Sequence, residues 1–151
     1  MLPSRRYGFE YMGSRRDFCT RLLVAIDVSG SVDNRQVSQA LSIINRFFKY
    51  GVENLDVIMF DYGLVGEPMS MKAAAETLQI GGRGGTEFQA PIDYFATGQY
   101  DGLVIITDGY APEPTLPGTT RGRILWMLYN DEPLTWIATF PRSRYVILPP
   151  I

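Results

Sequence analysis

The residues best suited to chemistry are carboxylates and hydroxyls that follow an apolar run. The run 22–26 stops at Asp27, and Ser29 and Ser31 come after it at every second position. Gly30 lets the chain curl there, so that both hydroxyls can turn back toward the Asp27 carboxylate. Oxygen ligands of this kind suit hard divalent cations, of which Mg²⁺ fits best and Mn²⁺ or Ca²⁺ are alternatives. This stretch therefore predicts one half of a metal site.

A second apolar run repeats the pattern. Residues 102–107 end at Asp108, which is followed by Gly109. Runs without polar alternation are typical of parallel strands buried on both faces, whose carboxyl ends carry the ligand-binding loops of an α/β sheet. Between the two runs, a glycine-rich loop leads through Gly85 to Thr86 and Glu87. We expect this loop to bring the Thr86 hydroxyl close to the first aspartate.

Residue types that are missing exclude several kinds of site. The chain has no histidine and a single cysteine, Cys19. Nucleophilic centres that use an imidazole base are therefore excluded, and so are zinc sites that need histidine or several thiolates. The loop 82–87 fails the dinucleotide-binding pattern because Glu87 stands where the last glycine belongs, and it has no P-loop lysine.

Other interpretations of these motifs remain open. Serine and aspartate at a strand–helix junction are also ordinary helix caps, although caps do not explain an aspartate at the end of each buried run. A metal-dependent phosphohydrolase could use Asp27 and Asp108, but Ser29 occupies the position where an acid–base carboxylate would be expected, and no lysine lies near a motif. A nucleotide-binding Rossmann-like domain is the other alternative. We expect no enzyme activity from this domain alone.

Length and charge fit one globular domain. The 151 residues are 46% hydrophobic and 20% charged, with a formal net charge of -2. That charge predicts no binding to nucleic acid or to a membrane surface, and no apolar run reaches the roughly 18 residues of a bilayer span. With one cysteine, we expect a cytoplasmic protein. Residues 1–20 are expected to form an arm or linker remnant, and residues 21–151 the domain.

Hydrophobic spacing and turn residues predict the remaining elements. Asp33 and Gln36 have capping-box spacing, so a helix begins here and ends before Gly51. The short turn 61–63 implies an antiparallel hairpin. Helices are expected over 71–78 and from Pro91 to Gly98, strands over 55–60, 64–69, 124–129 and 145–148, and either state over 134–140.

Taken together, the motifs resemble a known family. Asp27-Val28-Ser29-Gly30-Ser31, Gly85-Thr86 and Thr107-Asp108-Gly109, in this order, are similar to the metal-ion-dependent adhesion site (MIDAS) of von Willebrand factor A (VWA) domains. The loop 84–88 and the turn 107–110 resemble more narrowly the VWA-like domain at the C-terminus of bacterial metallopeptidase-like proteins. This resemblance covers about residues 20–148.

The resemblance implies a fold, a ligand set and a partner. The fold is a three-layer, Rossmann-like doubly wound α/β sheet of order 3-2-1-4-5-6, with strand 3 antiparallel. Ser29, Ser31 and Thr86 correspond to hydroxyl ligands, and Asp27 and Asp108 to carboxylates that bind directly or through water. Gly30, Gly85, Glu87 and Gly109 would support them. A partner's Asp or Glu would complete the metal shell, and a MoxR-type AAA+ ATPase is the implied partner. The oligomeric state stays open.

The sequence departs from the family pattern between strands 4 and 5. The segment 110–122 contains Pro112, Pro114 and Pro117, which exclude a long helix. One face of the sheet should then lack part of its cover. The N-terminal arm, the region of Trp126 and Trp136, or another protein surface would have to bury it.

Overall fold

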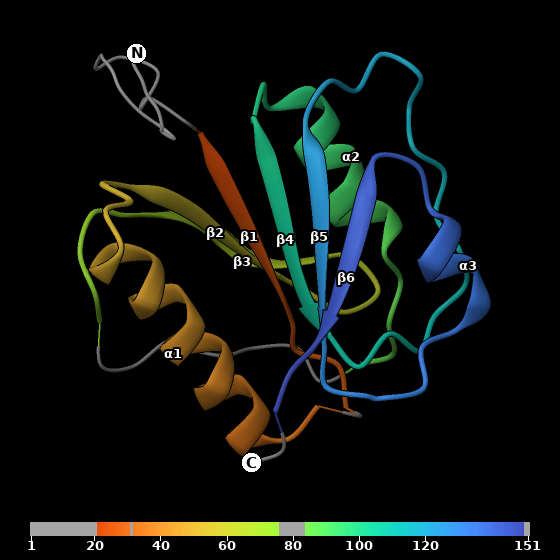
Figure 1. Ribbon diagram of the computed structural model, residues 1–151, viewed down its shortest axis with the longest axis horizontal. Helices are drawn as coiled ribbons and strands as arrows, with labels where there is room; N and C mark the ends of the chain where they lie inside the picture. Colours follow the sequence, from red (N-terminus) through yellow and green to blue (C-terminus); the bar gives the residue numbers. More distant parts are fainter. Residues whose placement is uncertain (1–20, 31, 76–83, 150–151) are drawn as a thin grey trace.

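A computed structural model describes residues 21–30, 32–75 and 84–149 of this chain. Its centre is one six-stranded sheet of order β3-β2-β1-β4-β5-β6, in which β3 alone runs antiparallel to its neighbour (Figure 1). The strands are β1 (Leu22–Asp27), β2 (Leu55–Phe60), β3 (Leu64–Met71), β4 (Gly102–Thr107), β5 (Arg123–Leu128) and β6 (Ser143–Ile147). The predicted fold class, strand order and direction of strand 3 are confirmed.

Three helices accompany the sheet: α1 (Asn34–Lys49), α2 (Gln89–Thr97) and α3 (Thr135–Thr139). The predicted capping box opens α1, since the Asp33 carboxylate accepts the Gln36 N–H and the Gln36 side chain accepts the Asp33 N–H. Gly51 follows the helix with a φ of 105°, a conformation that favours glycine. Gly98 caps α2 as expected, and the ambiguous segment 134–140 forms the short α3.

The helix predicted over 71–78 is wrong in the part that the structure describes. Strand β3 continues to Met71, because its antiparallel pairing with β2 reaches Leu55, and residues 72–75 then form bends and irregular chain. Pairing along the sheet overrides the helical spacing of these residues. The rest of that segment, 76–83, lies outside the described residues, as does the arm 1–20.

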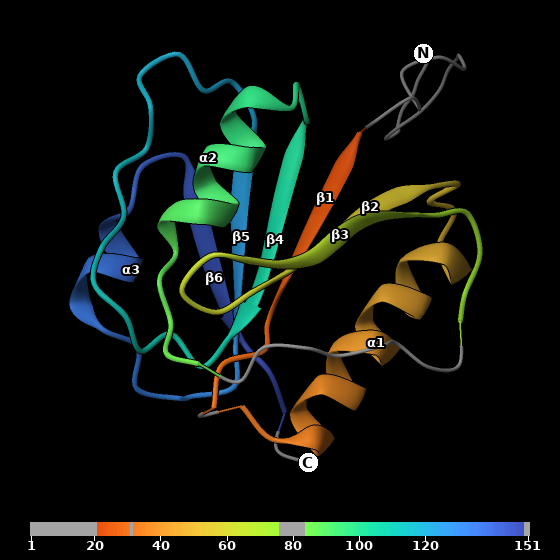
Figure 2. The ribbon, with the colours of Figure 1, turned by 180° about the vertical axis from the view of Figure 1, so that it is seen from behind.

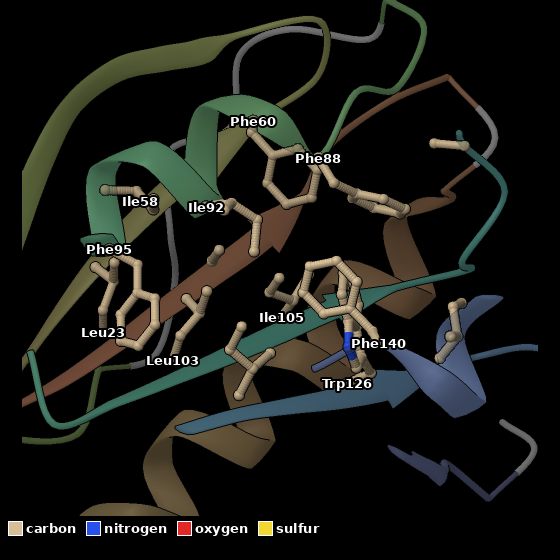
Figure 3. Packing of buried hydrophobic residues seen from close by; sticks show 14 of the residues in the cluster. Leu23, Ile58, Phe60, Phe88, Ile92, Phe95, Leu103, Ile105, Trp126 and Phe140 are labelled. Atoms are coloured by element: carbon tan, nitrogen blue, oxygen red, sulfur yellow. The ribbon is translucent and has the colours of Figure 1, made fainter. Parts of the chain in front are cut away.

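The sheet separates two hydrophobic clusters. The cluster on the α1 face includes Val24, Ile26 and Ile44. The cluster on the α2 and α3 face is aromatic, with Phe88 5.1 Å from Trp126 between ring centroids and Trp126 5.6 Å from Phe140 (Figure 3). Figure 2 shows α2 in front of this second face, and the residues of α1 belong to the cluster on the opposite face.

The proline-rich segment between β4 and β5 forms no helix in the structure. It packs instead on the aromatic face through Ala111 and Leu116. The Trp136 indole N–H donates to the Ala111 carbonyl oxygen at 3.2 Å, which ties this segment to α3. The region of Trp126 and Trp136 therefore covers this face. Among the described helices, none is long and apolar enough to cross a membrane.

Candidate metal centre

Asp27 ends β1 as a fully buried carboxylate. The backbone N–H of Ser29 donates to its Oδ1 at 2.8 Å, and the Thr107 hydroxyl donates to its Oδ2 at 2.6 Å. The Ser29 side chain hydrogen-bonds the same carboxylate. Because Ile26 pairs with Ile106 in the parallel register, the ends of β1 and β4 lie side by side, which places Thr107 next to Asp27. The first predicted half of the site is thus a fixed, hydrogen-bonded carboxylate.

Asp108 directly follows β4 and is 6% exposed. Its Oδ1 accepts the backbone N–H of Tyr110 at 3.1 Å. Between them Gly109 has a φ of 83°, so a glycine is required for the turn. The Gly109 N–H donates to the Thr107 hydroxyl oxygen at 3.1 Å, which fixes that hydroxyl for its own bond to Asp27. The turn after β4 therefore supports both carboxylates.

The glycine-rich loop is anchored to two neighbouring strand ends. The Gly30 N–H donates to the Gly84 carbonyl at 2.8 Å, and the Gly84 N–H donates to Asp61 Oδ2 at 3.1 Å. The Glu87 N–H donates to the Asp61 carbonyl at 2.8 Å. These bonds hold the half-buried Thr86 beside the loop after β1. Ser31 lies outside the described residues, so its predicted role as a ligand stays a prediction.

Tyr62 explains why residue 85 is a glycine. A Cβ on Gly85 would lie 2.4 Å from Cζ and 2.5 Å from Oη of the Tyr62 ring. The ring therefore packs directly over the backbone next to Thr86, although Tyr62 as a whole is 66% exposed. The Glu87 side chain is exposed, and Glu87 contributes its backbone N–H to the loop.

Burial determines the electrostatics at the end of β1. Desolvation raises the pKa of Asp27 above its ordinary value of 3.8; the hydrogen bonds from Ser29 and Thr107 oppose this rise, and the charge of Asp108 adds to it. Tyr129 lies within range of both carboxylates: desolvation raises its pKa, and the charges of Asp27 and Asp108 raise it further. Its hydroxyl donates to the Gln36 carbonyl of α1 at 2.6 Å. Two interacting carboxylates are thus held in a desolvated place.

The donor set fits a hard divalent cation. Asp27 and Asp108 supply carboxylates, and Ser29 and Thr86 supply hydroxyls from the adjacent loops. The ion pair found within the described part of the chain joins Arg35 to Asp33, so it does not neutralise either buried carboxylate. No group of three or more His, Cys, Asp or Glu side chains gathers among the described residues. The acidic part of the candidate site is therefore this pair.

Sequence reasoning gave no role at the site to three residues that organise it. Thr107 could have been found from the parallel register of β1 and β4. Ile26 pairs with Ile106, so the next residue of β4, Thr107, lies beside Asp27. Asp61 was assigned to a turn, yet it too is a carboxylate at the end of a buried strand, and it anchors the loop before Thr86. Tyr129 gives no local signal, because only the folded chain brings this residue, which follows β5, next to the first turn of α1 and near the carboxylates.

Known proteins support the fold. The family described as "VWA-like domain (DUF2201)" matches residues 22–140. A protein of Thermotoga maritima described as uncharacterized is 29% identical over 133 residues, which are 86% of this chain and 32% of that protein. The chain thus spans about a third of this relative's length. The crystal structure of an aerotolerance-related membrane protein from Bacteroides fragilis aligns with a TM-score of 0.53 at 17% identity, over 72% of this chain and 67% of that one. This likeness shows the fold.

Proposed function

The chain belongs to the VWA-like domain (DUF2201) family, and from this premise we propose that it is a metal-ion-dependent protein-interaction module. In this proposal Asp27, Ser29, Ser31, Thr86 and Asp108 hold one divalent cation, with Mg²⁺ as the expected ion. The module then recognises an acidic side chain of a protein partner. It acts by binding and not by catalysis.

One observation carries the proposal: two buried, interacting carboxylates end neighbouring parallel strands. Asp27 is 0% and Asp108 is 6% exposed; Asp27 is the last residue of β1, and Asp108 directly follows the neighbouring strand β4. Burying two carboxylates side by side is unfavourable unless a positive charge compensates them. A cation with oxygen ligands provides that compensation.

The residues around the pair have distinct roles in this proposal. Thr107 and the Ser29 N–H orient the Asp27 carboxylate, and Asp61 holds the loop that presents Thr86. When bound, the cation supplies an open coordination position for a carboxylate oxygen. Helix α1 begins at Asn34 near this end of the sheet (Figure 1). The positive end of its dipole favours an arriving anion.

The wider context follows from the resemblance to the C-terminal domain of metallopeptidase-like proteins. We propose that this domain works as part of such a protein and that its partner is a MoxR-type AAA+ ATPase. The relative from Thermotoga maritima leaves room for further domains, since the alignment covers 32% of it. Partner and context are tested separately from metal binding.

Calorimetric titration with Mg²⁺ and with Mn²⁺ tests the first step. The wild type should bind one cation, and Asp27→Ala should bind none. Since Asp27→Ala leaves the buried Thr107 hydroxyl without its acceptor, Asp108→Asn serves as a second variant, and circular dichroism shows that each variant is folded. Glu113→Gln, an exposed carboxylate outside the site, is the matched control. Equal binding by all four proteins, or binding by none, would contradict the proposal.

The enzyme alternative is tested with the same variants. A phosphohydrolase should turn over a generic phosphate ester, such as p-nitrophenyl phosphate, and should lose that turnover in Asp27→Asn. A nucleotide-binding domain should gain thermal stability with saturating ATP or NAD, because a ligand that binds the folded state stabilises it. We expect neither result. Either one would replace the binding module with that alternative.

A further inference from the structure

The face of the sheet that carries α1 is only half covered. Among the described helices, α1 packs on β1, and α2 and α3 lie on the opposite face. Figure 1 shows no helix in front of β5 and β6 on this face. The inward apolar residues of β5 there, Leu125 and Met127, are only half-buried, in contrast to Val24 and Ile26 of β1, which are fully buried.

The uncovered half forms an apolar groove with a cationic rim. The groove has a volume of ≈ 450 Å³. The parallel register places Arg123 beside Gly102, and Arg144 beside Leu125. Because side chains alternate between the faces of a strand, both arginines share the face of Leu125. The floor and rim are made by Leu22, Val104, Leu125, Arg123 and Arg144.

Neither arginine is neutralised within the described part of the chain. Arg123 and Arg144 are exposed, and the ion pair found there joins Arg35 to Asp33 instead. The third arginine of the rim, Arg142, donates from Nε to the Gly122 carbonyl at 2.8 Å and from Nη2 to the Arg121 carbonyl. Two unpaired cations therefore lie beside half-buried apolar side chains. This combination is typical of an interaction surface.

We propose that this groove docks an acidic amphipathic helix of a protein partner. The three strands β4, β5 and β6 span about 10 Å across, which matches the diameter of one α-helix. Their length of five or six residues matches about three helical turns. The chain itself covers the other half of this face with a helix, α1. Apolar side chains of the partner would cover Leu22 and Leu125, and its carboxylates would meet Arg123 and Arg144.

Charge argues against two other occupants. A second copy of this chain, packed face to face, would bring the arginines of both copies together. The arm 1–20 carries Arg5, Arg6, Arg15 and Arg16 against two acidic residues, so it is repelled by the same rim. An acidic partner is the occupant that the rim favours. This surface lies toward the amino ends of the strands, away from the candidate metal centre, and the inference is independent of the proposed function.

Paired synthetic peptides test the docking site. The acidic probe is a helical peptide of about 15 residues with leucines at i, i+3, i+4 and i+7 and glutamates at the flanking positions. The basic probe keeps the leucines and replaces each glutamate by lysine. Fluorescence anisotropy should show binding of the acidic probe at least about tenfold tighter than that of the basic probe. Equal affinity for both probes, or no binding of either, would overturn the proposal.

Charge reversal supplies the decisive control. The double variant Arg123→Glu/Arg144→Glu should invert the preference, so that the basic probe binds more tightly. Arg46→Glu, the same reversal on the exposed side of α1, should leave the preference unchanged. Leu125→Lys should abolish binding of both probes while circular dichroism stays unchanged. Analytical ultracentrifugation completes the test: self-association that Leu125→Lys abolishes would assign the face to a second copy and contradict the acidic helix.

Discussion

An aspartate lies at the carboxyl end of both β1 and β4, yet the two carboxylates have different surroundings. Asp27 accepts hydrogen bonds at both oxygens, from the Ser29 N–H and from the Thr107 hydroxyl. Asp108 accepts one at Oδ1, from the Tyr110 N–H, and is slightly exposed. Among the described residues, Asp27 is therefore held by the neighbouring strand, while Asp108 is held by its own turn.

This difference assigns different tasks to the two aspartates. Both oxygens of Asp27 are fixed by hydrogen bonds, so this carboxylate cannot reorient. It holds Ser29 and Thr107 in place, and its negative charge attracts the proposed cation. In the proposed site, Asp108 Oδ2, which accepts no bond from the described residues, is the oxygen that we expect to bind the cation. The asymmetry also means that substitutions at the two strand ends should differ in stability even where they agree in loss of metal binding. Measurements of the stability of such variants test this expectation.

Thr107→Val should have the largest effect on stability. Valine keeps the shape but removes the hydroxyl that donates to Asp27 and accepts from Gly109. Losing a hydrogen bond to a buried charged group costs about 1.5–3 kcal/mol. Urea denaturation in the presence of chelator measures this loss. Thr97→Val is the matched control, because the Thr97 hydroxyl bonds only to exposed backbone of α2, and its effect should stay within about 0.5 kcal/mol. A comparable loss in both variants would refute the special role of Thr107.

Asp27→Asn should stabilise the metal-free protein at neutral pH. Desolvation raises the folded-state pKa of Asp27 above 3.8, so its favourable contribution is complete below that value and is lost as the pH rises through the raised pKa. The asparagine has no charge to bury, and its amide can still accept from Ser29 and bond to Thr107. Urea titrations in chelator across acidic to neutral pH should show a smaller decline for the variant than for the wild type.

An exposed carboxylate provides the control for this pH dependence. Asp131→Asn should follow the wild-type curve, since Asp131 is exposed. Added Mg²⁺ should stabilise the wild type and leave Asp27→Asn unchanged, because the variant has lost one of the two carboxylates that the proposed site needs. If Asp27→Asn and Asp131→Asn behaved alike, burial would not govern this carboxylate.

The sequence is sufficient to predict most of the fold because its signals are strong and local. The unbroken apolar runs ending at Asp27 and Asp108 predict buried parallel strands, and the capping box at Asp33 predicts the start of α1. The short turn at 61–63 predicts the antiparallel β3. The expected helix over 71–78 failed where strand pairing with β2 prevailed over local spacing. At the start of this segment, the hydrogen bonds of the sheet outweigh the local helix propensity.

The candidate site could be predicted only in part, because part of it depends on contacts between distant residues. The two aspartates and Thr86 carry recognisable motifs. Asp61 does not, because its role comes from bonds to Gly84 and Glu87, more than 20 residues away. The same holds for Tyr129, whose hydroxyl reaches Gln36 across 93 positions. Residues that position a site, in contrast to those that would touch its ligand, are visible only after folding.

Gly85→Ala should have a small effect on stability and on Mg²⁺ affinity. It changes the loop beside Asp27 and leaves the turn that holds Asp108 as it is. The added Cβ would meet the Tyr62 ring at 2.4 Å, but this ring is the exposed end of a flexible side chain and can move away. We expect a loss of stability of about 0.5–1 kcal/mol and a weaker affinity for Mg²⁺, since the loop on the Asp27 side presents Thr86. Gly118→Ala, where no atom lies within 4 Å of the new Cβ, should change neither.

In a Tyr62→Ala background the penalty of Gly85→Ala should disappear, because the ring it displaces is gone. A penalty that persists would place its origin in the backbone at residue 85 and would contradict a role for the Tyr62 ring in holding the loop that presents Thr86.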